Sequence, residues 1–318
     1  MKTLITGGAG FIGSHLTDFL LSQGRLVTIL DDFSTGSRNN LKQIKKNRSL
    51  SVWEGSVLDK SLLDTLVRNN DETYHLAAVV GVMEYLKHPL KTLKTNIEGT
   101  ENVLESTRQH GKKALIISSS EVYGYGGSDL KETDPGTIGS PVKSLRWGYG
   151  LSKSVDEFFA LSYHEHFRVP LVIVRPFNIV GPRQTGFYGM VLPRFIKQAF
   201  ANESITVFGN GEQTRSFTYV KTFVKILYEL MDCQKANGRV INIAGKEEVS
   251  ILGLAEIVKL ATKSKSPITF IPYEEAYGTE LFEDALKRSA DVSLLESLLG
   301  WSPKETVEDI VLRTIKEE

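Results

Sequence analysis

Tyr149 and Lys153 are the two side chains of this sequence whose types and spacing best suit proton transfer. Residues i and i+4 share one face of a helix, so the phenol and the ammonium would meet the same space. A phenol has a pKa of about 10, too high for a base at neutral pH, but a nearby positive charge favours the phenolate. We therefore expect Tyr149 to be a general base assisted by Lys153. The alternative is a solvated helix face, because this spacing often arises by chance.

Three serines and a glutamate, Ser118, Ser119, Ser120 and Glu121, stand upstream of this pair, directly after an apolar run. Ser119 is the hydroxyl that we expect to share the reacting oxygen with Tyr149, because a serine can donate a hydrogen bond to a developing alkoxide. The alternative is that the serines cap the end of a strand, and we expect this of at least one of them.

Three glycines at a spacing of three, Gly7, Gly10 and Gly13, follow the first apolar run. Such a turn lets the backbone approach a pyrophosphate and places the phosphates at a helix N-terminus. Alone it could equally be a plain strand-to-helix turn. Asp31, however, ends the second apolar run about 20 residues further on, where a carboxylate can accept hydrogen bonds from the adenosine ribose and repel a 2′-phosphate. The pattern predicts NAD rather than NADP, unless Asp31 only caps its strand. An oxidised nicotinamide would then favour the phenolate of Tyr149 together with Lys153.

Short apolar runs alternate with longer amphipathic patterns through the first half of the chain. This alternation predicts βαβ units and a parallel sheet that is buried on both faces. The predicted strands are residues 3–6, 26–30, 73–76, 114–118 and 171–174, and the predicted helices are residues 13–23, 89–109 and 149–167. The expected fold class is α/β, a Rossmann-type doubly wound parallel sheet with a smaller C-terminal substrate-binding lobe.

Glycine and proline become frequent after Pro176, as in a loop-rich lobe that closes over a ligand. We expect residues 1–175 to form the NAD-binding domain. Residues 176–318 should form mainly the substrate-binding lobe, with some segments returning to the first domain.

The composition points to a small-molecule partner. The 38 basic and 38 acidic residues cancel, so no global field attracts nucleic acid or an acidic membrane. Cys233 is the only cysteine, which excludes an intramolecular disulfide and a multi-cysteine metal site and suits a reducing compartment. The first apolar stretch ends too soon for a signal peptide, and no run is long enough for a membrane helix. We expect a cytoplasmic protein without a bound metal.

These residues together resemble the extended short-chain dehydrogenase/reductase family, whose members epimerise, dehydrate or decarboxylate nucleotide sugars. The matching motifs span nearly the whole chain, at residues 7–13, 31, 75–78, 96–100, 119–124, 149–153, 175–178, 181–183 and 213–217. The resemblance implies NAD contacts from Gly7, Gly10, Phe11, Ile12, Gly13, Asp31, Ser56, Val57, Leu76, Ala77, Ala78, Asn96, Tyr149 and Lys153. It also implies a homodimer formed through the helices at residues 89–109 and 149–167.

Within this family the sequence is most similar to bacterial UDP-glucuronate decarboxylases. The similarity includes Glu84-Tyr85, Ser120-Glu121, Arg146-Trp147 and Arg288. It implies that Glu121 positions the sugar and its proton transfers and that Arg288 stabilises the enolate left when carbon dioxide departs. The substrate contacts that it implies are Glu84, Tyr85, Ser120, Asn178, Arg183, Arg215 and Arg288. A guanidinium binds phosphate bidentately, although each arginine could be an ordinary surface residue.

Departures from the family pattern keep other reactions open. Ser56 stands where family members often have an aspartate for the adenine, and Ser120 stands where dTDP-glucose dehydratases have an aspartate. We rank a UDP-glucuronate decarboxylase first, a 4-epimerase of UDP-glucose, UDP-GlcNAc or UDP-glucuronate second and a 4,6-dehydratase third. A redox enzyme that releases NADH and a catalytically silent NAD-binding protein are further alternatives. The intact Ser119, Tyr149 and Lys153 set argues against the silent protein.

Overall fold

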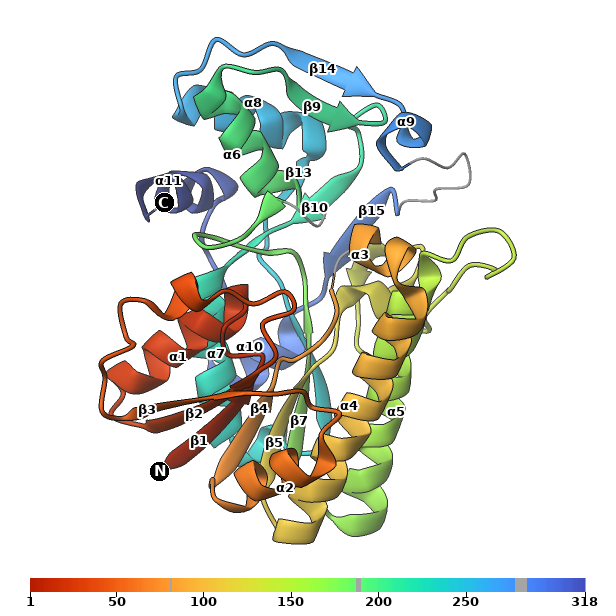
Figure 1. The fold of residues 1–318 in the computed structure, drawn as a ribbon. Helices are drawn as coiled ribbons and strands as arrows, with labels where there is room; N and C mark the ends of the chain where they lie inside the picture. Colours follow the sequence, from red (N-terminus) through yellow and green to blue (C-terminus); the bar gives the residue numbers. More distant parts are fainter. Residues whose placement is uncertain (81, 187–189, 278–284, 318) are drawn as a thin grey trace.

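Seven strands form the central sheet of the protein, in the order β12-β7-β5-β4-β1-β2-β3 (Figure 1). Every neighbouring pair is parallel, so each connection must cross over the sheet, as in the doubly wound Rossmann fold. This confirms the fold class predicted from the sequence. In chain order these strands are β1 (Lys2–Thr6), β2 (Leu26–Asp31), β3 (Leu50–Glu54), β4 (Glu72–His75), β5 (Lys113–Ile117), β7 (Leu171–Pro176) and β12 (Arg239–Ile243).

This is a computed structural model, which describes residues 1–80, 82–186, 190–277 and 285–317. Successive residues of a strand point to opposite faces of the sheet, so a sheet that is buried on both faces needs continuous apolar runs. Leu4 and Ile5 of β1 illustrate this, because both are fully buried yet belong to two different hydrophobic clusters. The apolar run of β1 therefore fits a central strand.

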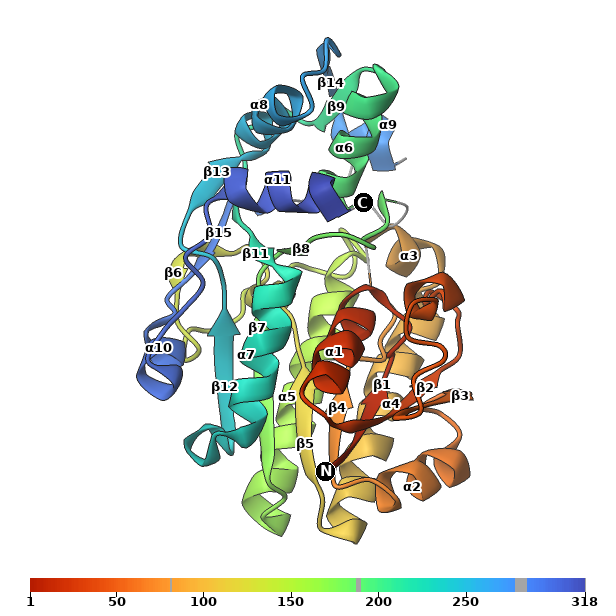
Figure 2. The same cartoon turned by 90° about the vertical axis from the view of Figure 1, so that its left-hand side faces the viewer.

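Helices cover both faces of the sheet (Figures 1 and 2). Helices α2, α4 and α5 pack against one another on one face, and α1 packs against α7 on the other. Proline at the first position and Gly111 in the left-handed conformation just after the last turn account for the ends of α4. The helices of this lobe are α1 (Phe11–Ser22), α2 (Lys60–Arg68), α3 (Val82–Lys87), α4 (Pro89–His110), α5 (Trp147–Phe167), α7 (Val220–Asp232) and α10 (Ser293–Leu299).

A smaller lobe lies beyond the carboxyl ends of the central strands (Figure 2). It contains a four-stranded sheet in the order β13-β10-β15-β6 and the pair β14-β9, while β11 pairs with β8 between the lobes. No helix of the described residues is long and apolar enough to cross a membrane. The elements are β6 (Gly127–Leu130), β8 (Ile179–Val180), α6 (Val191–Ala201), β9 (Ile205–Phe208), β10 (Thr214–Ser216), β11 (Thr218–Tyr219), β13 (Glu248–Ser250), α8 (Ile251–Ala261), β14 (Ile268–Ile271), α9 (Tyr273–Tyr277), β15 (Lys287–Ala290) and α11 (Val307–Glu317).

The five strands and three helices expected from the sequence are present, with ends that differ by one or two residues. Sequence reasoning missed β3 and β12, which lie at the two edges of the central sheet. The chain also crosses between the lobes. Helix α7 and strand β12 return from the second half to the central sheet, while β6 from the first half joins the small sheet. The division of the chain at residue 176 stays a prediction.

Candidate active site

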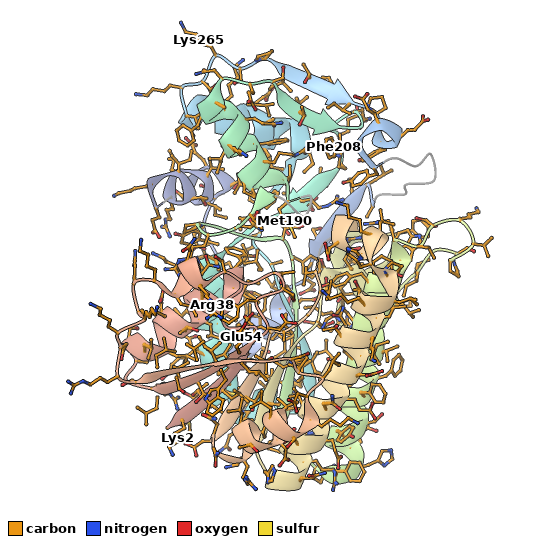
Figure 3. The ribbon with its side chains drawn as sticks, viewed as in Figure 1. Lys2, Arg38, Glu54, Met190, Phe208 and Lys265 are labelled. Atoms are coloured by element: carbon orange, nitrogen blue, oxygen red, sulfur yellow. The ribbon has the colours of Figure 1, made fainter. Side chains whose placement is uncertain are left out.

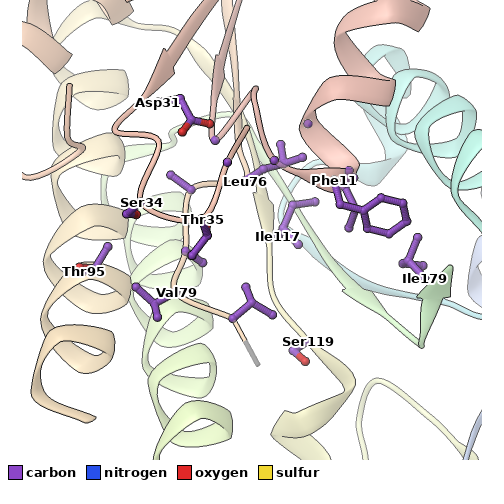
Figure 4. A pocket seen from close by; sticks show the side chains of 18 of the residues that line it. Phe11, Asp31, Ser34, Thr35, Leu76, Val79, Thr95, Ile117, Ser119 and Ile179 are labelled. Carbon is purple, nitrogen blue, oxygen red and sulfur yellow. The ribbon is translucent and has the colours of Figure 1, made fainter. Parts of the chain in front are cut away.

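A cavity of about 760 Å³ opens at the carboxyl ends of the central strands. It lies where the strand order reverses between β1 and β4, the position at which open α/β sheets bind their ligands. Asp31 and Ser119 lie toward opposite ends of it (Figure 4). The residues predicted from the sequence that line it are Gly7, Gly10, Phe11, Ile12, Gly13, Asp31, Ser56, Val57, Leu76, Ala77, Ala78, Ser119, Ser120, Glu121, Tyr149, Lys153, Asn178 and Arg183.

The glycine turn between β1 and α1 leaves no room for side chains. A Cβ on Gly7 would lie 2.7 Å from the backbone nitrogen of Ala77, and a Cβ on Gly13 would lie 2.1 Å from the carbonyl oxygen of Gly7. Gly7 also has a φ of +74°, which glycine adopts without strain. Gly10 precedes the first turn of α1 and offers no capping side chain. The free backbone N–H groups of that turn face the cavity, which suits a diphosphate.

Asp31 ends β2 and is 7% exposed. Its carboxylate accepts hydrogen bonds from the backbone N–H groups of Ala9 and Phe33, each at 2.8 Å. Burial raises the pKa of Asp31, and these two hydrogen bonds oppose that shift. The carboxylate therefore organises the end of its strand and also lines the cavity, while its contact with the adenosine ribose stays a prediction. An acidic group at one end and a glycine cradle beside it fit a dinucleotide such as NAD.

Ser119, Tyr149 and Lys153 come together at the other end of the cavity. Ser119 caps a 3-10 turn at residues 120–123 and accepts a hydrogen bond from the backbone N–H of Glu121 at 3.1 Å. It also hydrogen bonds with Tyr149. Ser118, in contrast, donates a hydrogen bond to the Glu157 side chain of α5 at 2.5 Å.

The electrostatics of Tyr149 differ from the simple expectation for a lysine neighbour. Burial raises the pKa of Tyr149, and the negative charges of Glu121 and Asp156 raise it further, while the hydrogen bond with Ser119 lowers it. The Lys153 ammonium forms an ion pair with Asp156, at 2.7 Å. Much of the positive charge expected to act on Tyr149 is therefore offset by a carboxylate.

Glu121 lies at the cavity between two arginines. Its Oε1 atom accepts a hydrogen bond from Arg288, and its Oε2 atom lies 3.4 Å from a guanidinium nitrogen of Arg146. Burial raises the pKa of Glu121, but the charges of Arg288 and Arg146 outweigh it and lower the pKa overall. Arg288 also donates to the carbonyl oxygen of Gly124 at 2.8 Å. The side chains of both arginines are only 3% exposed, so each faces the cavity from behind the Glu121 carboxylate that it contacts.

Several predicted residues do not line the cavity in the part of the chain that the structure describes: Glu84, Tyr85, Asn96, Arg215 and Arg288. Tyr85 is buried against α5, where a Cβ on Gly148 would meet its hydroxyl oxygen. Asn96 instead binds the backbone of Val79 and the Ser152 hydroxyl, and so supports the cavity wall from behind. The substrate and cofactor roles of these residues stay predictions.

Arg215, Arg183 and Asn178, the other predicted contacts to the substrate, each have a partner within the protein. Arg215 is the direct neighbour of Arg288 across the parallel strands β10 and β15, and it donates to the Ala285 carbonyl oxygen at 2.8 Å. Arg183 forms an ion pair with Asp18 of α1, at 2.7 Å. Asn178 donates to the Ser216 carbonyl oxygen.

Sequence reasoning missed part of the cavity wall and two charged residues behind it. Met190, which lies between the two lobes (Figure 3), and Tyr277 line the cavity from segments with no recognisable motif. Arg146 was noted only as part of a similar stretch. Asp156 could have been found, because it stands three residues after Lys153 and thus on the same helix face.

Three comparisons with known proteins agree with this arrangement. A family model described as GDP-mannose 4,6 dehydratase matches residues 4–314. A UDP-N-acetyl-alpha-D-glucosaminuronate decarboxylase of Bacillus cytotoxicus is 38% identical over 316 residues, covering 99% of this chain and 97% of that protein. UDP-glucuronic acid decarboxylase 1 of Danio rerio is 34% identical, covering 99% and 72%. The crystal structure of UDP-glucuronic acid 4-epimerase from Bacillus cereus with UDP-glucuronic acid and NAD superposes with a TM-score of 0.89 and 30% identity, covering 100% and 98%.

Proposed function

The chain belongs to the GDP-mannose 4,6 dehydratase family of NAD-dependent nucleotide-sugar enzymes, and we propose that it removes the C6 carboxylate of a UDP-linked uronic acid as carbon dioxide. The predicted cofactor, NAD, is confirmed by the relatives of this fold that contain it. Two decarboxylases that match nearly the full chain support the choice of reaction.

The chemistry of such a substrate assigns a task to each group. A carboxylate leaves readily as carbon dioxide only when a ketone stands β to it, so C4 of the sugar must first be oxidised. Bound NAD would accept the hydride from C4 and later return it. Tyr149 takes the proton of the C4 hydroxyl, and Ser119 hydrogen bonds with the same oxygen. Carbon dioxide departs with breakage of the C5–C6 bond, and C5 then takes up one proton.

The contact of Glu121 with Arg288 and Arg146 is the observation that carries the decarboxylase proposal. A carboxylate that is held by two arginines at the cavity can accept hydrogen bonds from the sugar hydroxyls without needing to be protonated. The excess positive charge behind it stabilises the negative charge that develops on the sugar when carbon dioxide leaves.

A 4-epimerase is the second candidate. The epimerase of Bacillus cereus is 30% identical to this chain over its full length. The two reactions share the oxidation at C4 and differ in whether the C5–C6 bond breaks. Only the product of the reaction therefore distinguishes the decarboxylase from the 4-epimerase.

Liquid chromatography with mass spectrometry tests the proposal, because the mass reveals loss of carbon dioxide and the chromatography separates C4 epimers, which have equal mass. The purified protein, loaded with NAD, is incubated separately with UDP-glucuronate and UDP-N-acetylglucosaminuronate, and with UDP-glucose as a control that has no C6 carboxylate. We expect at least one uronate to lose the mass of one carbon dioxide, and UDP-glucose to keep its mass. If both uronates keep their mass but a C4 epimer forms, the enzyme is an epimerase. If neither changes, the decarboxylase proposal is wrong.

We also propose that the chain forms a homodimer through α4 and α5, which lie side by side (Figure 1). Large apolar side chains are exposed on these helices, including Leu90 at 80%, Leu151 at 49% and Phe158 at 75%. Burial of such a surface against a second copy is favourable. Sedimentation should show the mass of two chains. A cytoplasmic location, and the lack of nucleic-acid or membrane partners, remain proposals from the composition.

A further inference from the structure

Asp156 is a buried carboxylate for which the reaction described above has no use. It lies one turn after Lys153 on α5, and its side chain is fully buried. The Lys153 ammonium, itself 2% exposed, donates to the Oδ2 atom of Asp156 at 2.7 Å. An ion pair without solvent is expensive unless further contacts support it, so its presence at a reaction centre asks for an explanation.

Other elements hold this ion pair from behind. The Thr100 hydroxyl of α4 lies close enough to Asp156 to lower the pKa of that carboxyl, while the Oδ1 atom of Asp156 has no hydrogen-bond partner among the described residues. The same hydroxyl lies 3.1 Å from the Nε2 atom of His75 at the end of β4, and the Nδ1 atom of His75 lies 2.8 Å from the Thr6 hydroxyl of β1. Burial and the charge of Lys153 lower the pKa of His75 to about 3, so His75 is neutral at working pH. Buried polar side chains thus connect Lys153 to β4 and β1, the two strands that flank the cavity.

The charges around Tyr149 come from several elements. Glu121 approaches it from the 3-10 turn at residues 120–123 and Asp156 from α5, and both are negative. Glu157, the next residue on α5, is instead paired with Arg175 of β7 at 2.7 Å. Asp156 is therefore the carboxylate that pairs directly with Lys153, and it weakens the effect of the ammonium on the phenol.

We propose that Asp156 is a positioning residue of the reaction centre, which holds the Lys153 ammonium in one place and neutralises part of its charge before that charge can act on Tyr149. This proposal rests on the proton transfer proposed for Tyr149. Its consequence is that Lys153 alone does not generate the phenolate. The positive nicotinamide ring of bound NAD would supply the remaining charge, so the base would form mainly in the oxidised enzyme.

Replacement of Asp156 by asparagine tests the proposal, because Asp156→Asn keeps the shape and an acceptor for Lys153 but removes the charge. A negative charge near a phenol raises its pKa, so its removal should lower the pKa of Tyr149. Asp156 follows Tyr149 by seven residues on α5, about 10 Å along a helix, so the expected shift is roughly one pH unit toward acid. The readout is the tyrosinate absorbance of the NAD-loaded protein during a pH titration, with Tyr149→Phe as the blank that isolates Tyr149. This measurement needs no substrate, so it is independent of the decarboxylase proposal.

Turnover gives a second readout. The acidic limb of the pH profile of kcat should move in the same direction, and KM should change by no more than about twofold, because Asp156 does not touch the cavity. Glu165→Gln, an exposed charge removal on the same helix, should move neither quantity. Equal Tyr149 titrations in the parent and in Asp156→Asn would overturn the proposal.

If Asp156→Asn does not fold, removal of the whole ion pair in Lys153→Met/Asp156→Leu provides the test, because it leaves no buried charge without a partner. The two opposite charges disappear together, so Tyr149 should titrate within roughly half a pH unit of the parent. A shift of about one unit or more to higher pH would show that Lys153 acts on Tyr149 without being neutralised, and would overturn the proposal.

Discussion

Replacement of Arg288 by methionine separates the two chemical steps that the proposed decarboxylase must perform. The guanidinium donates to Glu121 and, at 2.8 Å, to the Gly124 carbonyl oxygen, and methionine cannot replace either hydrogen bond. Loss of a hydrogen bond to a charged group costs about 1.5–3 kcal/mol, and a buried carbonyl without its donor costs about 1–3 kcal/mol. Because methionine keeps most of the apolar contacts, we expect a loss of about 3 kcal/mol in the free energy of unfolding. For 318 residues this corresponds to a Tm roughly 5 °C lower.

The effect of Arg288→Met on activity should be selective. The pKa of Glu121 should rise, because burial raises it and one of the two opposing charges is gone. Release of carbon dioxide should slow by about 100-fold or more, as when one electrostatic donor is removed from a reaction centre. Oxidation at C4 does not need this charge, so NADH should accumulate on the enzyme when UDP-glucuronate is added.

Rapid-mixing absorbance records NADH formation, and trapping of the released gas records decarboxylation, in the same sample. Lys287→Met is a matched control, because Lys287 is the exposed neighbour of Arg288 on β15. It should leave both rates unchanged. If Arg288→Met slows NADH formation and carbon dioxide release equally, Arg288 does not act on the second step and the reasoning is refuted.

Two further predictions concern the cofactor. Gly13→Ala should abolish tight NAD binding, because the new Cβ would lie 2.1 Å from the Gly7 carbonyl oxygen. Gly24→Ala is the control: a Cβ there would have no atom within 4 Å, so NAD binding should stay intact, although the φ of +73° makes this variant less stable. Equal NAD affinities of the two variants would contradict this geometry. Asp31→Ala should weaken NAD binding by about tenfold or more, because the backbone N–H groups of Ala9 and Phe33 lose their acceptor, and it should relax the preference for NAD over NADP. Calorimetric titration with both cofactors measures the two affinities. A parent protein that binds NAD and NADP equally would disprove the role of Asp31.

The parts of the fold that were predictable from sequence are those that depend on local pattern. The apolar runs of β1, β2, β4, β5 and β7 are buried on both faces and therefore read as strands without any knowledge of their partners. Strand β3 was missed because its residues Ser51 to Glu54 are exposed, and an edge strand needs no continuous apolar run. The exchange of β6 and β12 between the two sheets depends on long-range pairing, which no local pattern records.

The same distinction applies to the candidate site, where residues of local motifs were predicted and contacts between distant segments were not. Gly7, Asp31 and Tyr149 could be chosen from the sequence because each belongs to a motif with a recognisable spacing along the chain.

The ionisation of Tyr149 could not be predicted in this way, because its pKa depends on charges from several elements. The i to i+4 spacing identified Lys153 as a neighbour of Tyr149. The same helix, however, also brings Asp156 into an ion pair with Lys153, and Glu121 from another segment of the chain lies near the phenol. A motif thus predicts which groups meet, whereas the sign of the resulting pKa shift requires every charge that packs around them. For this enzyme we therefore expect the Tyr149 phenolate to form mainly when the oxidised cofactor is bound, because Asp156 offsets part of the charge of Lys153.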